Sequence, residues 1–164
     1  DYLINKRTVK ADLVAKSRIE WIQEVRKLTA DFITTSTDAV FIAQNYTIAQ
    51  NRDDELKFLR ELDDKIVEAM MQVNLLKLYI PIHKAKGDLT DINDDKKIVE
   101  KNASNNNYIF YCKNIVLKLH ELRKGIVASS KDDLEKGVFV ATEELSRYSS
   151  VYLKKEWEKA KSIK

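Results

Sequence analysis

Apolar residues return every three or four positions along most of this chain, a spacing that places them on one face of an α-helix. The first such segment covers about residues 5–47, and a continuous helix of about 40 residues would be roughly 60 Å long. We expect residues 34–37, a Thr-Thr-Ser-Thr run of weak helix propensity, to loosen its middle. Its apolar positions include Leu13, Val14, Ile19, Ile22, Val25, Leu28, Phe32, Ile33, Val40 and Ala43.

A second stripe covers residues 53–80 and has signals at both ends. Asn51 or Asp53 can cap its start, because their side-chain oxygens accept hydrogen bonds from free N–H groups of the first turn. Pro81 lacks an N–H group and disfavours helical geometry in the residue before it, so we expect a kink or a stop there. The predicted core face consists of Leu56, Leu59, Leu62, Ile66, Met70, Val73, Leu76 and Ile80.

Two further helices are predicted after a loop over residues 87–95. The third covers residues 93–128, and we expect its polar part at 101–107 to fray or bend. The fourth begins with a cap at Ser130 and reaches residue 163. Their apolar stripes contain Ile109, Cys112, Ile115, Val116, Leu119 and Leu122 in the third helix, and Leu134, Val138, Ala141, Leu145, Tyr148, Tyr152 and Trp157 in the fourth.

Four long amphipathic segments with short connections predict an all-α fold, an antiparallel up-down four-helix bundle that forms one domain over residues 1–164. The composition agrees, because the chain has three Gly and one Pro where average usage would give about eleven and eight. Both chain ends of such a bundle lie at the same end. Since the sequence starts at Asp1, inside the helical pattern, we expect it to be a soluble fragment of a longer chain.

The same composition argues against most catalytic sites. Phosphate-binding loops and strained nucleophile turns need glycine-rich segments, and this chain has only three glycines. The two histidines, His83 and His120, lie on different segments, and neither follows a glutamate by three residues as in the metal sites of helix bundles. The one cysteine, Cys112, lies on an apolar stripe and reads as a core residue. We therefore predict no enzyme activity, no catalytic or metal-binding residue and no cofactor.

Basic residues gather near both chain ends, although the net charge is only +3. Residues 1–18 hold five basic and two acidic side chains, and residues 147–164 hold six basic and two acidic ones. An up-down bundle would bring them together in one basic end. We predict that this end contacts an anionic surface through Lys6, Arg7, Lys10, Lys154, Lys155, Lys159 and Lys161. A membrane surface is favoured over nucleic acid, because aromatic residues are not interleaved with the basic ones. A solvated face without a partner is the alternative.

Aromatic residues suggest one further surface. Tyr108, Phe110 and Tyr111 form a cluster that is either core packing or a groove for a protein partner. Trp21 and Trp157, in the first and last helices, are expected to pack near each other and to tie the two chain ends together.

Residues 16–28 contain the pattern Arg18-x-x-Trp21-Ile22-x-x-x-Arg26. This segment resembles one found in small bacterial and prophage proteins of unknown function, in which a membrane helix precedes it. The resemblance implies a helical domain on the cytosolic side of a membrane tether, and it assigns no activity or binding residue.

These observations favour a non-enzymatic helical interaction domain, the cytosolic part of a membrane-anchored bacterial or phage protein that acts by protein–protein contact. Self-association is also expected as a mode of contact, because helices of about 40 residues can outrun a monomeric core. One alternative is a nucleic-acid-binding bundle that uses the basic end. Another is a sensory bundle that binds a small ligand between its helices. We expect a cytoplasmic location, with a tether in a segment outside this chain.

Overall fold

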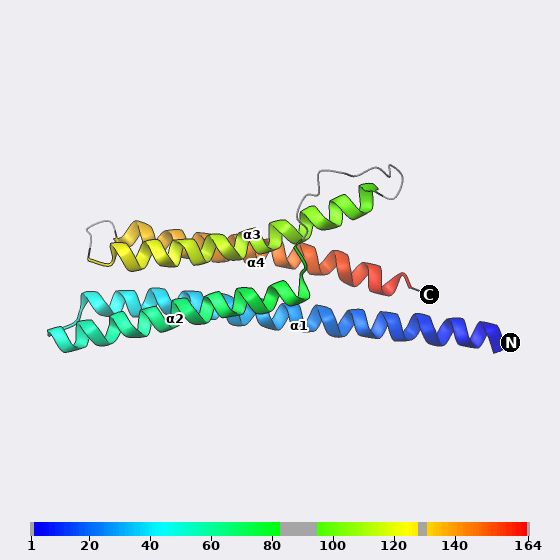
Figure 1. Ribbon diagram of the computed structural model, residues 1–164, viewed down its shortest axis with the longest axis horizontal. Helices are drawn as coiled ribbons and strands as arrows, with labels where there is room; N and C mark the ends of the chain where they lie inside the picture. The colour runs from blue at the N-terminus through cyan, green and yellow to red at the C-terminus, as the bar shows by residue number, and fades with distance from the viewer. Residues whose placement is uncertain (1, 83–94, 128–130, 164) are drawn as a thin grey trace.

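The structure is a computed structural model that describes residues 2–82, 95–127 and 131–163 (Figure 1). Within these ranges it contains no strand, so the prediction of an all-helical chain is confirmed there. The helices are α1 (Tyr2–Thr47), α2 (Arg52–Tyr79), α3 (Asp95–Gly125) and α4 (Lys131–Lys161).

The helices lie lengthwise, with α1 beside α2 and α3 beside α4 (Figure 1). Helices α1 and α3 each pack against all the others. Helix α1 meets the end of α2 at Trp21, whose indole Nε1 donates a hydrogen bond of 3.0 Å to the carbonyl oxygen of Tyr79. Helix α1 also meets the end of α4 at Arg18, whose guanidinium Nη2 lies 3.6 Å from the Glu156 carboxylate oxygen Oε2. The first turns of α1 and the last turns of α4 therefore lie at the same end of the molecule (Figure 1).

Helix α1 is longer than its neighbours and extends beyond them at this end (Figure 1). Because Arg18 is level with Glu156 and α4 ends at Lys161, about ten residues of α1, roughly 15 Å of helix, have no helix beside them. Residues 4–10 are accordingly all exposed. We call residues 4–14 the α1 overhang.

The Thr-Thr-Ser-Thr run does not break α1, contrary to the expectation of a loosened middle. The hydroxyl groups of Thr34, Ser36 and Thr37 bond back to carbonyl groups one turn earlier in the same helix, whereas Thr35 bonds to side chains of α2. Ser36 Oγ donates to Phe32 O at 2.8 Å, and Thr34 Oγ1 donates to Ala30 O at 2.9 Å. The side chains that lower helix propensity are thus hydrogen-bonded while the backbone stays helical.

Both ends of α2 form as the sequence predicts. The Asn51 side chain accepts a hydrogen bond of 2.9 Å from the backbone N–H of Asp54. The helix stops at Tyr79, with Ile80 in a non-helical conformation before Pro81. The cap at Ser130 and residues 87–94 of the predicted loop lie outside the described residues, while Asp95, the last residue of that predicted loop, begins α3.

The polar start of α3 is helical throughout residues 101–107, so the expected fraying is absent there. The reason is that Asn105 is buried and hydrogen-bonded. Its side-chain oxygen accepts a hydrogen bond of 2.6 Å from the Tyr152 hydroxyl, and its amide nitrogen donates one of 3.4 Å to the carbonyl oxygen of Pro81. A residue that lowers helix propensity here fastens α3 to α4 and to the end of α2.

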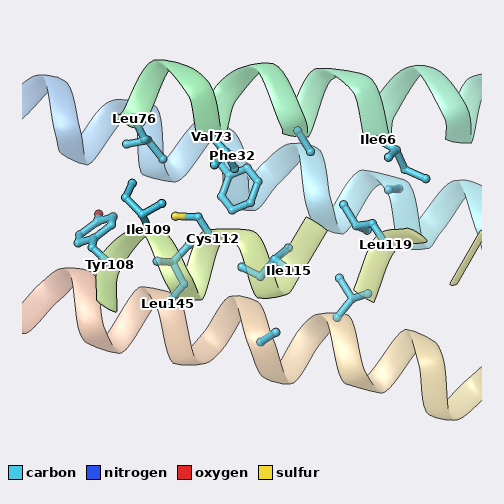
Figure 2. Packing of buried hydrophobic residues seen from close by; sticks show 14 of the residues in the cluster. Phe32, Ile66, Val73, Leu76, Tyr108, Ile109, Cys112, Ile115, Leu119 and Leu145 are labelled. Atoms are coloured by element: carbon cyan, nitrogen blue, oxygen red, sulfur yellow. The ribbon is translucent and has the colours of Figure 1, made fainter. Parts of the chain in front are cut away.

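Side chains from all four helices form one continuous core. Phe32 of α1, Leu76 of α2 and Leu145 of α4 surround Cys112 and its neighbours on α3 (Figure 2). The burial of Cys112 confirms its assignment to the core.

Two positions of the predicted α2 core face, Leu56 and Met70, are exposed, and so are two apolar positions of the α1 stripe, Leu13 and Val14. The last two lie in the α1 overhang, where no neighbour covers them.

Candidate functional site

A short chain of buried hydroxyl groups crosses the core at Tyr108. The Tyr108 hydroxyl lies 2.6 Å from Thr29 Oγ1 on α1 and 2.6 Å from Ser149 Oγ on α4. Thr29 Oγ1 also lies 2.7 Å from the carbonyl oxygen of Val25. Each hydroxyl has one proton, so a single arrangement satisfies all three contacts: Ser149 donates to Tyr108, Tyr108 to Thr29, and Thr29 to Val25.

Aromatic rings surround this chain. The Tyr108 ring lies edge-on to Tyr152, with 5.1 Å between centroids, and Tyr148 packs against both. The Tyr148 hydroxyl donates to the carbonyl oxygen of Ser104 at 2.8 Å. Trp21 faces Tyr152 with 6.3 Å between centroids, rather than Trp157, so the two tryptophans do not pair as expected.

The environment keeps these groups protonated. Burial raises the pKa of Tyr108 to about 12, and it also raises the pKa of Tyr152 and of Tyr148 above the usual value. Burial likewise raises the pKa of the Cys112 thiol to about 12. A thiol and phenols held neutral in this way serve packing, because nucleophilic or acid–base chemistry near neutral pH needs a lowered pKa or one close to the working pH.

The proposed aromatic groove is divided by the fold. Tyr108 is fully buried, Tyr111 is half-buried, and Phe110 is 66% exposed. The rings of Phe110 and Tyr111 are 6.3 Å apart. Phe110 is therefore the most exposed of the three, and the groove as such remains a prediction.

The cations of the proposed basic end occupy two zones. Lys6, Arg7 and Lys10 lie on the α1 overhang, and the others lie near the end of α4. Within the described part of the chain, Lys159 is engaged by Glu156 at 2.7 Å, and Lys161 lies over the Trp157 ring at 5.5 Å from its centroid. The remaining cations of the set, Lys6, Arg7, Lys10, Lys154 and Lys155, make no ion pair with a described residue.

A groove of about 640 Å³ lies between α1 and α4, and we call it the α1–α4 groove. Thr29 and Ser149, the two ends of the hydroxyl chain, line it, so the groove adjoins the polar part of the core. Arg26 and Lys154 are the charged groups among its described lining residues, and no acidic side chain lines it. The other lining residues are Ile22, Gln23, Ala30, Ile33, Ser146, Ser150, Leu153 and Trp157.

Several of the exposed apolar side chains lie on α2 and α3, and we call this set the α2–α3 face. Met71 is 62% exposed and Leu78 is 78% exposed. A depression of about 310 Å³ lies between the two helices, and Met70 and Leu117 of this set line it together with Lys77, Lys113 and His120. The face consists of Val67, Met70, Met71, Leu75 and Leu78 on α2, and Phe110 and Leu117 on α3.

The sequence contains a second apolar stripe that predicts this face, but it was overlooked because it runs beside the stripe assigned to the core. Val67, Met71, Leu75 and Leu78 repeat at spacings of four, four and three, parallel to the buried stripe of Ile66, Val73 and Leu76 on the same helix. A helix with two apolar stripes buries one in its own bundle and leaves the other exposed. The α1–α4 groove gave no comparable signal, because its residues are distant in sequence.

No protein-family model, curated protein or solved structure matches this chain. Among the described side chains, no group of three or more His, Cys, Asp or Glu residues is placed to hold a metal ion. None of the helices, as far as they are described, combines the length and apolar character needed to cross a membrane.

Proposed function

We propose that this chain is a non-enzymatic helical interaction domain, whose α2–α3 face binds an amphipathic helix with acidic flanks on a partner protein. The four helices would form an antiparallel up-down bundle that holds this face rigid. Supporting this topology, Lys65 on α2 lies 4.0 Å from Asp38 on α1, and Arg123 on α3 lies 2.7 Å from Asp63 on α2. The observation that carries the proposal is the second apolar stripe of α2.

Exposed apolar patches of this kind often mark protein contacts, because burying them recovers the hydrophobic free energy. The chain has two methionines, Met70 and Met71, and both lie on this face. Methionine is flexible and polarisable, so it adapts to the side chains of a docking helix. Phe110 and Leu117 are seven residues apart on α3, two helical turns, so they lie on the same side of that helix, and both are exposed.

The positive charges around the depression favour a partner with acidic side chains. Lys77 and Lys113 line it, and none of its described lining residues is acidic. Lys77 Nζ is hydrogen-bonded to the Asn74 side-chain oxygen at 3.1 Å, but neither lysine has an ion-pair partner among the described residues. Glutamate or aspartate beside the apolar stripe of a docking helix would complement both cations.

The test uses a fluorescent amphipathic peptide with leucines on one face and glutamates on its flanks, and a matched peptide with lysines in place of the glutamates. We expect anisotropy to show binding of the acidic peptide only. Leu78→Gln and Leu75→Gln should each weaken it about tenfold, the scale of one buried leucine. Val140→Gln, an equally polar change at an exposed valine of α4, should leave it unchanged.

Equal binding of both peptides, or binding that survives the Leu75 and Leu78 changes, would refute this partner chemistry. Sedimentation of the chain alone tests whether a second copy of the chain binds this face instead. A dimer that dissociates in Leu78→Gln would assign the face to self-association.

A second observation favours a location beside an anionic membrane. The α1 overhang combines exposed apolar residues, Ile4, Val9 and Leu13, with cations that have no ion pair among the described residues, Lys6 and Lys10. Apolar contact together with positive charge is the combination that holds a helix at an anionic lipid surface. We propose that the basic end faces such a surface, as expected of a cytoplasmic domain on a bacterial or prophage membrane protein.

Flotation with phosphatidylglycerol vesicles tests this location. The chain should float with these vesicles and not with phosphatidylcholine vesicles. The pair Lys6→Gln with Lys10→Gln should weaken binding about thirtyfold, at about 1 kcal/mol for each lysine near the surface. The pair Lys124→Gln with Lys136→Gln, which lies at the opposite end, is the control. Salt-sensitive retention of DNA or RNA without vesicle binding would favour the nucleic-acid alternative.

A further inference from the structure

We infer that the α1–α4 groove binds a small organic anion, a carboxylate joined to an apolar body. This site is separate from the α2–α3 face, which lies on other helices, so neither inference depends on the other. The groove volume of about 640 Å³ falls within the range of small-molecule sites.

The charge in the groove determines the sign of the ligand. Arg26 enters from α1 and Lys154 enters from α4. Neither makes an ion pair with a described residue, and no carboxylate lines the groove. A carboxylate placed between these side chains would accept charge-assisted hydrogen bonds from both helices.

The hydroxyl groups of the groove divide into two sets. The protons of Thr29 and Ser149 are used within the hydroxyl chain of the core, by the arrangement derived above. Ser146 and Ser150, which are exposed on α4, make no hydrogen bond in the described part of the chain. They are therefore the hydroxyls that are free to donate to a ligand beside Lys154.

The apolar part of the lining accounts for the rest of the ligand. Ile22 and Leu153 are buried and form the floor, while Ile33 and the half-buried ring of Trp157 supply walls. A ligand without an apolar body would leave these surfaces wet, so the site should discriminate against simple anions. The indole of Trp157 also provides a spectroscopic reporter inside the groove.

Two-dimensional amide NMR of the whole chain, titrated with octanoate and with naphthoate, tests the site. We expect at least one of them to shift the Trp157 indole signal and the amides of the lining residues in a saturable way. The neutral compounds octanol and naphthamide should bind about tenfold more weakly than their acids, and acetate should produce no saturable shift.

Variants then assign the contacts. Arg26→Gln and Lys154→Gln should each weaken binding about tenfold, the scale of one charge-assisted hydrogen bond. Lys27→Gln and Lys155→Gln are matched controls, because these lysines adjoin the first two in sequence, are exposed, and do not line the groove. Ser150→Leu, at an exposed position, should fill the groove and abolish binding with the fold intact.

Absence of a saturable shift with both acids would overturn the inference. So would equal binding of the acids and their neutral counterparts, or a loss of binding in the control variants as large as in the groove variants. None of these results would affect the peptide-binding test of the α2–α3 face.

Discussion

Replacing Tyr108 by phenylalanine removes one oxygen atom from the centre of the core and keeps the ring. That oxygen makes two hydrogen bonds of 2.6 Å, to Thr29 and to Ser149, and the tyrosine is fully buried. A typical hydrogen bond contributes about 1 kcal/mol, so the loss of both predicts a fall of about 2 kcal/mol in the free energy of unfolding. For a chain of this size that corresponds to a melting temperature about 4–8 °C lower.

The hydroxyl chain makes the prediction sharper. Ser149 loses its acceptor in Tyr108→Phe, whereas Thr29 keeps Val25 O as the acceptor of its own proton. A double-mutant cycle with Ser149→Ala should therefore show coupling of about 1 kcal/mol, because the two hydroxyls lose the same bond. Urea unfolding followed by circular dichroism measures all four proteins.

Tyr111→Phe is the matched control for this experiment. Tyr111 is half-buried in the same aromatic cluster, and its hydroxyl has no hydrogen bond to a described residue. Its removal should change stability by less than about 0.5 kcal/mol. If Tyr108→Phe proves as mild as Tyr111→Phe, or if the cycle shows no coupling, the hydroxyl chain does not stabilise the fold.

Three further predictions concern stability and reactivity. Burial raises the pKa of Tyr108 from 10.0 to about 12, so the stability that its protonated form contributes is complete below pH 10 and is lost as the pH rises to about 12. In alkaline titrations, the free energy of unfolding of Tyr108→Phe should therefore fall less steeply with pH over this interval than that of the unchanged protein. The Cys112 thiol, whose pKa burial raises to about 12, should react with a disulfide reagent only at the rate of global unfolding, in contrast to a cysteine introduced by Ser150→Cys. Gly137→Ala should stabilise the protein by about 0.5–1 kcal/mol in urea unfolding, since the position is helical and the added Cβ would meet only Lys118 atoms at 3.8 Å; a destabilisation would contradict this.

The sequence predicted the parts of this fold that depend on local chemistry. The Asn51 cap and the stop before Pro81 follow from single side chains and their own backbone, and both form. Two of the predictions that failed concerned polar residues in helices. The hydroxyls of residues 34–37 and the amide of Asn105 lower helix propensity, but hydrogen bonds satisfy them, and for Asn105 the partner is on another helix.

Burial was harder to predict than helix position. Met70 and Leu78 have the same apolar character as the buried Leu76, and only the packing of α2 against its neighbours decides which stripe stays exposed. The lining of the α1–α4 groove is beyond sequence reasoning for a related reason. Arg26 and Lys154 are ordinary surface cations until two helices distant in sequence lie side by side.

The overhang of α1 gives this molecule a stiff lever. Its residues extend a helix already nucleated by the packed part, so they need no nucleation step of their own. The same continuity aligns the tip with the axis of α1 along the core. A domain attached to the first residues of α1 would therefore transmit its rotation to Trp21 and Arg18, which contact the last turns of α2 and α4.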